Sequence, residues 1–113
     1  MTVSKREIWL ANLNPQKRPN EVGKTRPVLV VQGDTLNHSE YGTVIVMPLT
    51  TRLIDNAEPL RMRVKKRGAL REDSDLLIAQ IRAIDKIRFV EKLGELELEE
   101  LEKAIRFFND ILE

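Results

Sequence analysis

A proline directly before an unbroken aliphatic run constrains this chain more than any other feature. The polar segment from Gly23 to Arg26 leads into Pro27, and the run Val28–Val31 follows. The proline ring fixes its own φ and disfavours a helical conformation for the residue before it, so Arg26 is expected to be extended. Proline is tolerated at the first residue of a strand, and such an apolar run is typical of a strand buried on both faces. We therefore predict that Arg26 lies at the rim of a rigid core strand, beside an open loop.

The composition predicts one folded domain over residues 1–113, because this length supplies a single hydrophobic core. There is no cysteine and a single histidine, His38, so we expect no disulfide, no metal site and no cofactor. The longest apolar run, Val44–Leu49, is far shorter than the roughly 20 residues needed to cross a bilayer. The first residues also lack the apolar segment of a signal peptide. These features favour a cytoplasmic protein without a membrane partner.

The charge is distributed unevenly along the chain. Residues 91–113 carry eight carboxylates and three basic side chains, a net charge of −5. Since the whole chain carries +1, residues 1–90 carry +6. A basic body with an acidic terminal element indicates a polyanionic ligand on the body, and ordinary solvated surface charge is the alternative.

Hydrophobic periodicity predicts a mainly β chain with a C-terminal α-helix, arranged as a small barrel or β-sandwich with the helix packed on it. The expected strands are Glu7–Leu13, Arg26–Gln32, Thr43–Leu49, Leu60–Val64, Asp75–Ile84 with a bend in its middle, and Val90–Leu96. The helix is predicted from an apolar stripe of Leu98, Leu101, Ile105, Phe108 and Leu112. No Ser, Thr, Asp or Asn marks its first residue.

Polar groups at strand ends are the main candidates for chemistry. Arg26 precedes one core strand, and Thr50 and Thr51 end another. A guanidinium fork matches two phosphate oxygens, and a threonine hydroxyl can donate to a third. The alternative is that Arg26 pairs with an acid and Thr50 only ends its strand. A basic groove, or else a solvated face, is expected from Lys17, Arg18, Lys24, Arg61, Arg63, Lys65, Lys66, Arg67 and Arg71.

Four sequence blocks, in this order and spacing, resemble the MazF/PemK family of toxin endoribonucleases. They are Glu7–Pro15, Gly23–Val31, Val46–Thr51 and Gln80–Lys86, so the resemblance spans nearly the whole chain. It implies a compact SH3-like barrel that forms a homodimer and is neutralised by a MazE-like antitoxin, whose extended tail occupies the RNA groove. It also implies metal-independent cleavage of single-stranded RNA, in which the ribose 2′-OH attacks the adjacent phosphate to leave a 2′,3′-cyclic phosphate and a 5′-OH end.

The resemblance also assigns roles to residues. By position, Arg26 corresponds to the family's catalytic arginine, Thr50 to its catalytic threonine and Glu21 to an acid found in many members. The substrate-binding residues that we expect beside them are Lys17, Arg18, Asn20, Lys24, Thr51 and Gln80.

Two departures from the family pattern favour the branch that relies on the arginine and threonine. Some PemK-type members carry a catalytic Arg and Asp, and Leu77 and Ala79 stand at those positions in this chain. Many relatives have a histidine in the first loop, whereas this chain has Pro19 and Asn20 in that region. A second interpretation is a non-catalytic CcdB-like toxin that inhibits a protein such as gyrase. A third is an SH3-like module that binds peptides, although the aromatic residues are too few and scattered for its groove.

Overall fold

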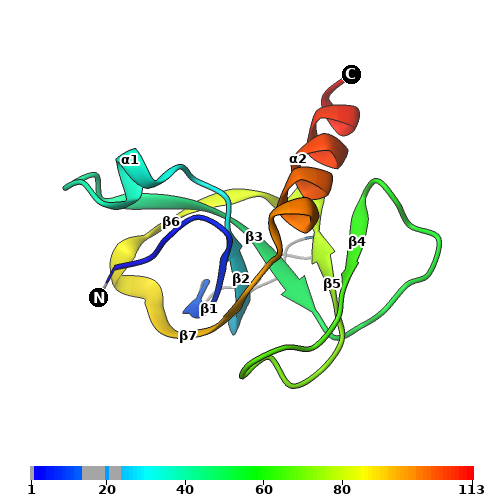
Figure 1. Ribbon diagram of the computed structural model, residues 1–113, viewed down its shortest axis with the longest axis horizontal. Helices are drawn as coiled ribbons and strands as arrows, with labels where there is room; N and C mark the ends of the chain where they lie inside the picture. Colours follow the sequence, from blue (N-terminus) through cyan, green and yellow to red (C-terminus); the bar gives the residue numbers. More distant parts are fainter. Residues whose placement is uncertain (1, 14–19, 21–23) are drawn as a thin grey trace.

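The computed structural model describes residues 2–13, 20 and 24–113, which form an antiparallel sheet with one long helix (Figure 1). The strands are β1 (Glu7–Asn12), β2 (Thr25–Val30), β3 (Thr43–Thr50), β4 (Arg61–Val64), β5 (Ser74–Leu77), β6 (Arg82–Asp85) and β7 (Phe89–Glu95). The helices are α1 (Asp34–Asn37), the 3-10 turns η1 (Ile78–Gln80) and η2 (Lys86–Arg88), and α2 (Leu98–Leu112).

The seven strands form one strongly curved sheet that does not close on itself. Hydrogen-bonded neighbours follow the order β4-β5-β3-β2-β1-β7, and β6 pairs with β3. Two register shifts between β1 and β7 mark bulges, which curve this side of the sheet. The expected fold class, a mainly β SH3-like barrel with a C-terminal helix, is confirmed, with the difference that the barrel is open between β7 and β4 in the described residues.

Both faces of the central strands are buried, as the aliphatic run predicts. Val28, Leu29 and Val30 in β2 are completely inaccessible to solvent. Leu29 contributes to a core with Ile8, Met47 and the helix α2, whereas Val28 belongs to a second core on the other face. Successive residues of a strand point to opposite faces, so β2 separates the two cores.

The segment predicted as one bent strand is divided by a turn. β5 pairs with the end of β3, where Thr50 lies opposite Asp75, while β6 pairs with the first half of β3, from Thr43 to Val46. The turn η1 joins the two strands. A single strand, β3, therefore belongs to two differently oriented parts of the sheet.

The N-cap of helix α2 is Glu97, not Ser, Thr, Asp or Asn, and glutamate carboxylates bond to the backbone at this end of the helix. The Glu100 side chain accepts a hydrogen bond from the backbone N–H of Glu97, the N-cap residue, at 2.8 Å. The Arg67 guanidinium donates to both oxygens of the same carboxylate. Acidic groups near a helix N-terminus are favourable. Arg67 therefore fastens the start of the helix to the turn that follows β4.

The buried face of α2 is rotated relative to the predicted stripe. Leu101, Ala104 and Phe107 are its buried residues, whereas Leu98 and Leu112 remain more than half exposed. Figure 1 shows the C-terminal end of α2 pointing away from the sheet, so the last turn has little sheet to cover. In the described residues, no helix has the length and apolar character that would span a membrane.

Candidate functional site

Several strand ends meet at one edge of the sheet, which we call the rim: the end of β1 at Asn12, the start of β2 at Thr25 and the end of β3 at Thr50. β1 pairs antiparallel with β2, and β2 pairs antiparallel with β3. Antiparallel neighbours bring the end of one strand next to the start of the other. The start of β7 reaches the same edge, because Phe89 lies opposite Ala11.

The antiparallel pairing of β2 with β3 brings the strand ends that carry Arg26 and Thr50 to the same edge of the sheet. The paired residues are Val28 with Pro48, Leu29 with Met47 and Val30 with Val46. Arg26 precedes the first of these pairs by two residues and Thr50 follows it by two, so the two residues stand at adjoining ends of paired strands. Arg26 is partly buried, and this burial lowers the pKa of its guanidinium. Arginine nevertheless stays protonated in proteins near neutral pH.

Thr50 has its hydroxyl oxygen engaged by the backbone. Its Oγ1 accepts a hydrogen bond from Arg52 N at 3.2 Å, and the residue is partly buried. A hydroxyl that accepts one hydrogen bond can still donate its own proton. The neighbouring Thr51 is exposed. The end of β3 therefore offers a hydroxyl donor beside the Arg26 position.

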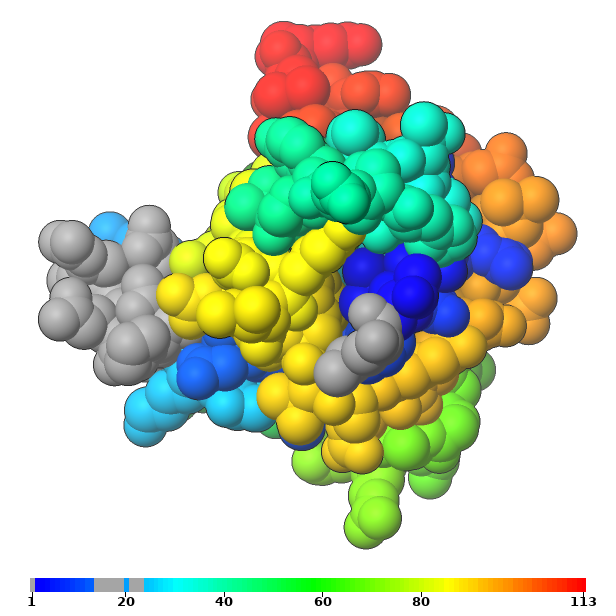
Figure 2. Space-filling view, turned by 90° about the vertical axis from the view of Figure 1, so that its left-hand side faces the viewer, coloured from blue at the N-terminus to red at the C-terminus, as the bar shows by residue number. Residues whose placement is uncertain are grey.

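Two arginines that the sequence analysis did not single out also reach the rim. Arg82 Nη2 donates to the carbonyl oxygen of Leu13 at 3.4 Å, and Arg88 Nη1 donates to that of Asn12 at 3.3 Å. Figure 2 shows the yellow β6–η2 region next to the blue end of β1. Within the described ranges, neither guanidinium takes part in an ion pair. The long-range pairing of β6 with β3 and of β7 with β1 gives them this position, so no local sequence signal identified them.

The basic groove expected from the middle of the chain is only partly realised. Arg61 and Arg63 do share one face of β4, but both pair with the Asp75 carboxylate. Arg67 pairs with Glu100. Arg63 also pairs with Asp55, so the three arginine charges are balanced by three carboxylates, whereas Lys65, Lys66 and Arg71 are exposed.

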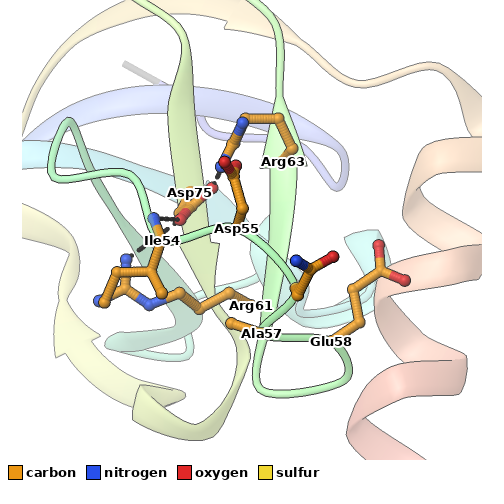
Figure 3. Close-up of a pocket in the computed structure, with 8 residues that line it drawn as sticks. Ile54, Asp55, Ala57, Glu58, Arg61, Arg63 and Asp75 are labelled. Atoms are coloured by element: carbon orange, nitrogen blue, oxygen red, sulfur yellow. Dashed lines mark hydrogen bonds and ion pairs between the residues drawn. The ribbon is translucent and has the colours of Figure 1, made fainter.

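Asp75 is a buried carboxylate of this region that no sequence pattern identified. Its side chain is 2% exposed and accepts hydrogen bonds from Arg63 Nε at 2.6 Å, Ile54 N at 2.9 Å and Arg61 Nη1 at 3.1 Å. Burial raises the pKa of the carboxyl, but these hydrogen bonds outweigh it and hold the pKa below its ordinary value. Figure 3 shows the three donors converging on Asp75. The same carboxylate lines an open cavity of about 580 Å³.

The remaining predicted residues are distributed as follows. Lys24 is exposed, adopts a left-handed backbone with φ 64°, and accepts a hydrogen bond from Leu13 N through its carbonyl. Asn20 is exposed, and Gln80 is partly buried in η1. Lys17, Arg18 and Glu21 lie outside the described residues. In the part of the chain that the structure describes, no three His, Asp or Glu side chains are grouped as a metal site would require.

His38 lies away from the rim. It follows α1, beyond the far end of β2, and its Nε2 is 2.9 Å from Ser4 Oγ. This contact holds the N-terminal segment against α1, together with the hydrogen bond from Lys5 N to Asp34.

Comparison with known proteins supports the resemblance to the MazF/PemK family over almost the whole chain. A family profile described as "PemK-like, MazF-like toxin of type II toxin-antitoxin system" matches residues 4–112. The sequence blocks around Arg26, Thr50 and Gln80 all lie within this match.

Solved structures with the same fold include several toxins. MazF (Form-I) from Deinococcus radiodurans has a TM-score of 0.79 at 23% identity, over 99% of this chain and 97% of that chain. Mycobacterium tuberculosis toxin MazF-mt6 has a TM-score of 0.75 at 19% identity, over 95% and 96% of the two chains. An endoribonuclease in complex with its cognate antitoxin, from a mycobacterial species, has a TM-score of 0.72 at 16% identity, over 98% and 93%.

The Asp75 cluster predicts a large, pH-dependent loss of stability in Asp75→Asn. Removing one partner of a buried ion pair costs about 3–5 kcal/mol, because the remaining charges lose their compensation. The pKa of Asp75 is lower in the folded state, so its contribution is complete above the unfolded-state pKa of about 3.9 and is lost as the pH falls below it. The difference in unfolding free energy between wild type and Asp75→Asn, measured with urea, is therefore expected to be largest near pH 7 and to narrow below about pH 4.

The matched control is Asp55→Asn, which removes the other carboxylate partner of Arg63. Asp55 is 80% exposed, so its loss should cost no more than about 1 kcal/mol at pH 7. An equal cost for the two variants would show that burial does not set the strength of the Asp75 interactions.

Proposed function

Because the chain belongs to the PemK-like, MazF-like toxin family of type II toxin–antitoxin systems, we propose that it cleaves single-stranded RNA at the rim. The observation that carries this proposal is the β2–β3 register, which sets an arginine and a threonine at neighbouring strand ends. Guanidinium and hydroxyl groups are suited to a phosphate that gains negative charge during a reaction.

In the proposed reaction the RNA supplies its own nucleophile. The ribose 2′-OH attacks the adjacent phosphorus, so that the O2′–P bond forms while the P–O5′ bond breaks. The products are a 2′,3′-cyclic phosphate and a 5′-OH end. The task left to the protein is to align the sugar with the phosphate and to stabilise the phosphorane.

We assign a separate part of this task to each residue. Arg26 neutralises the phosphorane and protonates the leaving O5′, and Thr50 donates a hydrogen bond to a non-bridging oxygen. Arginine is a poor base, so another group has to accept the proton of the 2′-OH. Glu21, which lies outside the described residues, is our candidate. This division of roles requires no metal ion.

The flanking nucleotides are proposed to contact the remaining polar groups around the rim. Lys24, Arg82 and Arg88 supply positive charge for neighbouring phosphates, and Arg82 and Arg88 are held at the end of β1 by their hydrogen bonds to backbone carbonyls. Asn20, Thr51 and Gln80 supply hydrogen-bonding groups, and Lys17 and Arg18 belong to the same proposed surface.

The cleavage proposal predicts that RNA oligonucleotides are cut in EDTA and that a single 2′-deoxy sugar at the cut site blocks cleavage. Arg26→Ala and Thr50→Ala should each lower the cleavage rate by about 10²–10³-fold, the usual effect of removing a donor to a developing oxyanion. Arg106→Ala, on an exposed part of α2, is the matched control and should cut normally. For every variant, cleavage is measured by mapping the 5′-OH ends that the protein produces on a long RNA.

A requirement for magnesium, or full activity of Arg26→Ala, would refute this mechanism. Complete absence of RNA fragments would favour the CcdB-like reading, in which the protein acts by binding another protein.

The flanking phosphate contacts predict a change in salt dependence. Arg82→Gln and Arg88→Gln should each weaken binding of an oligonucleotide that carries a 2′-deoxy sugar at the cut site. Each lost contact to single-stranded nucleic acid should reduce the slope of log K against log salt by about 0.7. Fluorescence anisotropy at several salt concentrations measures this slope, with Arg106→Gln as control. Slopes equal to that of wild type would show that neither arginine contacts an RNA phosphate.

The proposed partners are a second copy of the chain and a MazE-like antitoxin. Solved MazE-MazF structures from Deinococcus radiodurans share this fold, which supports an antitoxin complex. Sedimentation of the purified protein should give about twice the chain mass of 13.1 kDa, and a bound antitoxin should suppress RNA cleavage. A monomer at micromolar concentration would contradict the dimer, and unchanged cleavage in the complex would contradict a shared surface for the antitoxin and RNA.

A further inference from the structure

A continuous chain of hydrogen bonds links the hydroxyl of Thr50 to the buried Asp75. Thr50 Oγ1 accepts from Arg52 N at 3.2 Å. The carbonyl oxygen of the same residue, Arg52, accepts from Arg61 Nη1 at 2.7 Å. That Nη1 also donates to Asp75 Oδ2 at 3.1 Å. The backbone of Arg52 thus connects the end of β3 to the side chains of β4 and β5.

Asp75 fixes one end of this series of hydrogen bonds. It lies directly opposite Thr50 in the β3–β5 pairing, so its backbone position is fixed relative to β3. Arg63 Nε and Ile54 N also donate to its carboxylate (Figure 3). The segment that leaves β3 is consequently held at Arg52 through Arg61 and at Ile54 through Asp75 itself.

The position of Arg52 determines how the Thr50 hydroxyl can act. While its oxygen accepts from Arg52 N, the side chain is held in one rotamer and the O–H proton remains available for another acceptor. A negatively charged phosphate oxygen at the rim is such an acceptor. If Arg52 moved, the hydroxyl could turn to other staggered positions and its proton could point elsewhere.

We propose that Arg61 and Asp75 are positioning residues that orient the Thr50 hydroxyl through the backbone of Arg52. This inference rests on the proposed function, because it gives Thr50 its role as a donor to the scissile phosphate. Arg61 and Asp75 do not touch the substrate in this arrangement. A stabilising role alone explains the cluster poorly, since well-packed apolar residues usually serve stability as well as a buried ion pair does.

The experiment is a double-mutant cycle of Arg61→Met with Thr50→Ala. Arg61→Met leaves Asp75 with the hydrogen bonds from Arg63 and Ile54, so the variant should fold. Single-turnover cleavage with enzyme in excess gives the maximal rate and the half-saturating concentration for all four proteins. Arg61→Met should lower the maximal rate by about 10–100-fold, as a small misplacement of a catalytic group does, with little change in half-saturation. In the Thr50→Ala background it should cause no further loss.

Arg67→Met is the matched control, because Arg67 also pairs with a carboxylate but does so at the start of α2. It should lower the melting temperature and leave the maximal rate unchanged.

The outcomes separate this inference from the function on which it rests. If Thr50→Ala cleaves at the wild-type rate, the proposed function fails. If Thr50→Ala is impaired but Arg61→Met is normal, or is equally harmful in both backgrounds, only the positioning role is overturned. A raised half-saturating concentration in Arg61→Met would instead show a direct contact between Arg61 and RNA, and would also overturn the inference.

Discussion

The structure depends on the pairing of β3 with three other strands. Its first half pairs with β6 and its middle with β2, while its last two residues pair with β5. Where β5 replaces β6 as the partner of β3, the chain passes from one part of the sheet to another, and the buried residues form two cores. The antiparallel pairing of β3 with β2 leaves the end of β3 beside the start of β2. The rim is therefore a direct consequence of the strand pairing.

Local sequence patterns were sufficient for most of the architecture. Pro27 and the aliphatic residues after it identified a doubly buried strand, and the apolar residues near the end of the chain identified α2. The facing of α2 was harder to predict, because the sheet beneath it decides which of several apolar residues are covered. Leu98 and Leu112 fit the helical stripe but extend past the available surface.

The candidate site was predicted only in part, for a related reason. Arg26 and Thr50 could be identified because each stands next to a recognisable strand boundary. Asp75 could not, because a carboxylate in an apolar strand finds its partners on β4 and in the preceding loop, more than ten residues away along the chain. Arg82 and Arg88 were missed likewise, since the carbonyl oxygens that receive them belong to the other end of the chain. Charge counted along the sequence also overstated the contribution of Arg61 and Arg63, which Asp75 and Asp55 balance.

The backbone hydrogen bonds of Arg82 and Arg88 have a thermodynamic consequence for any polyanion that binds the rim. A long arginine side chain loses rotamer entropy, worth up to about 2 kcal/mol, when it is fixed. Each guanidinium has five N–H donors, and the carbonyl of Asn12 or Leu13 engages one nitrogen of each. Folding has therefore already restricted these side chains while leaving donors for a phosphate, so association with a charged strand should lose less conformational freedom here than at the exposed lysines.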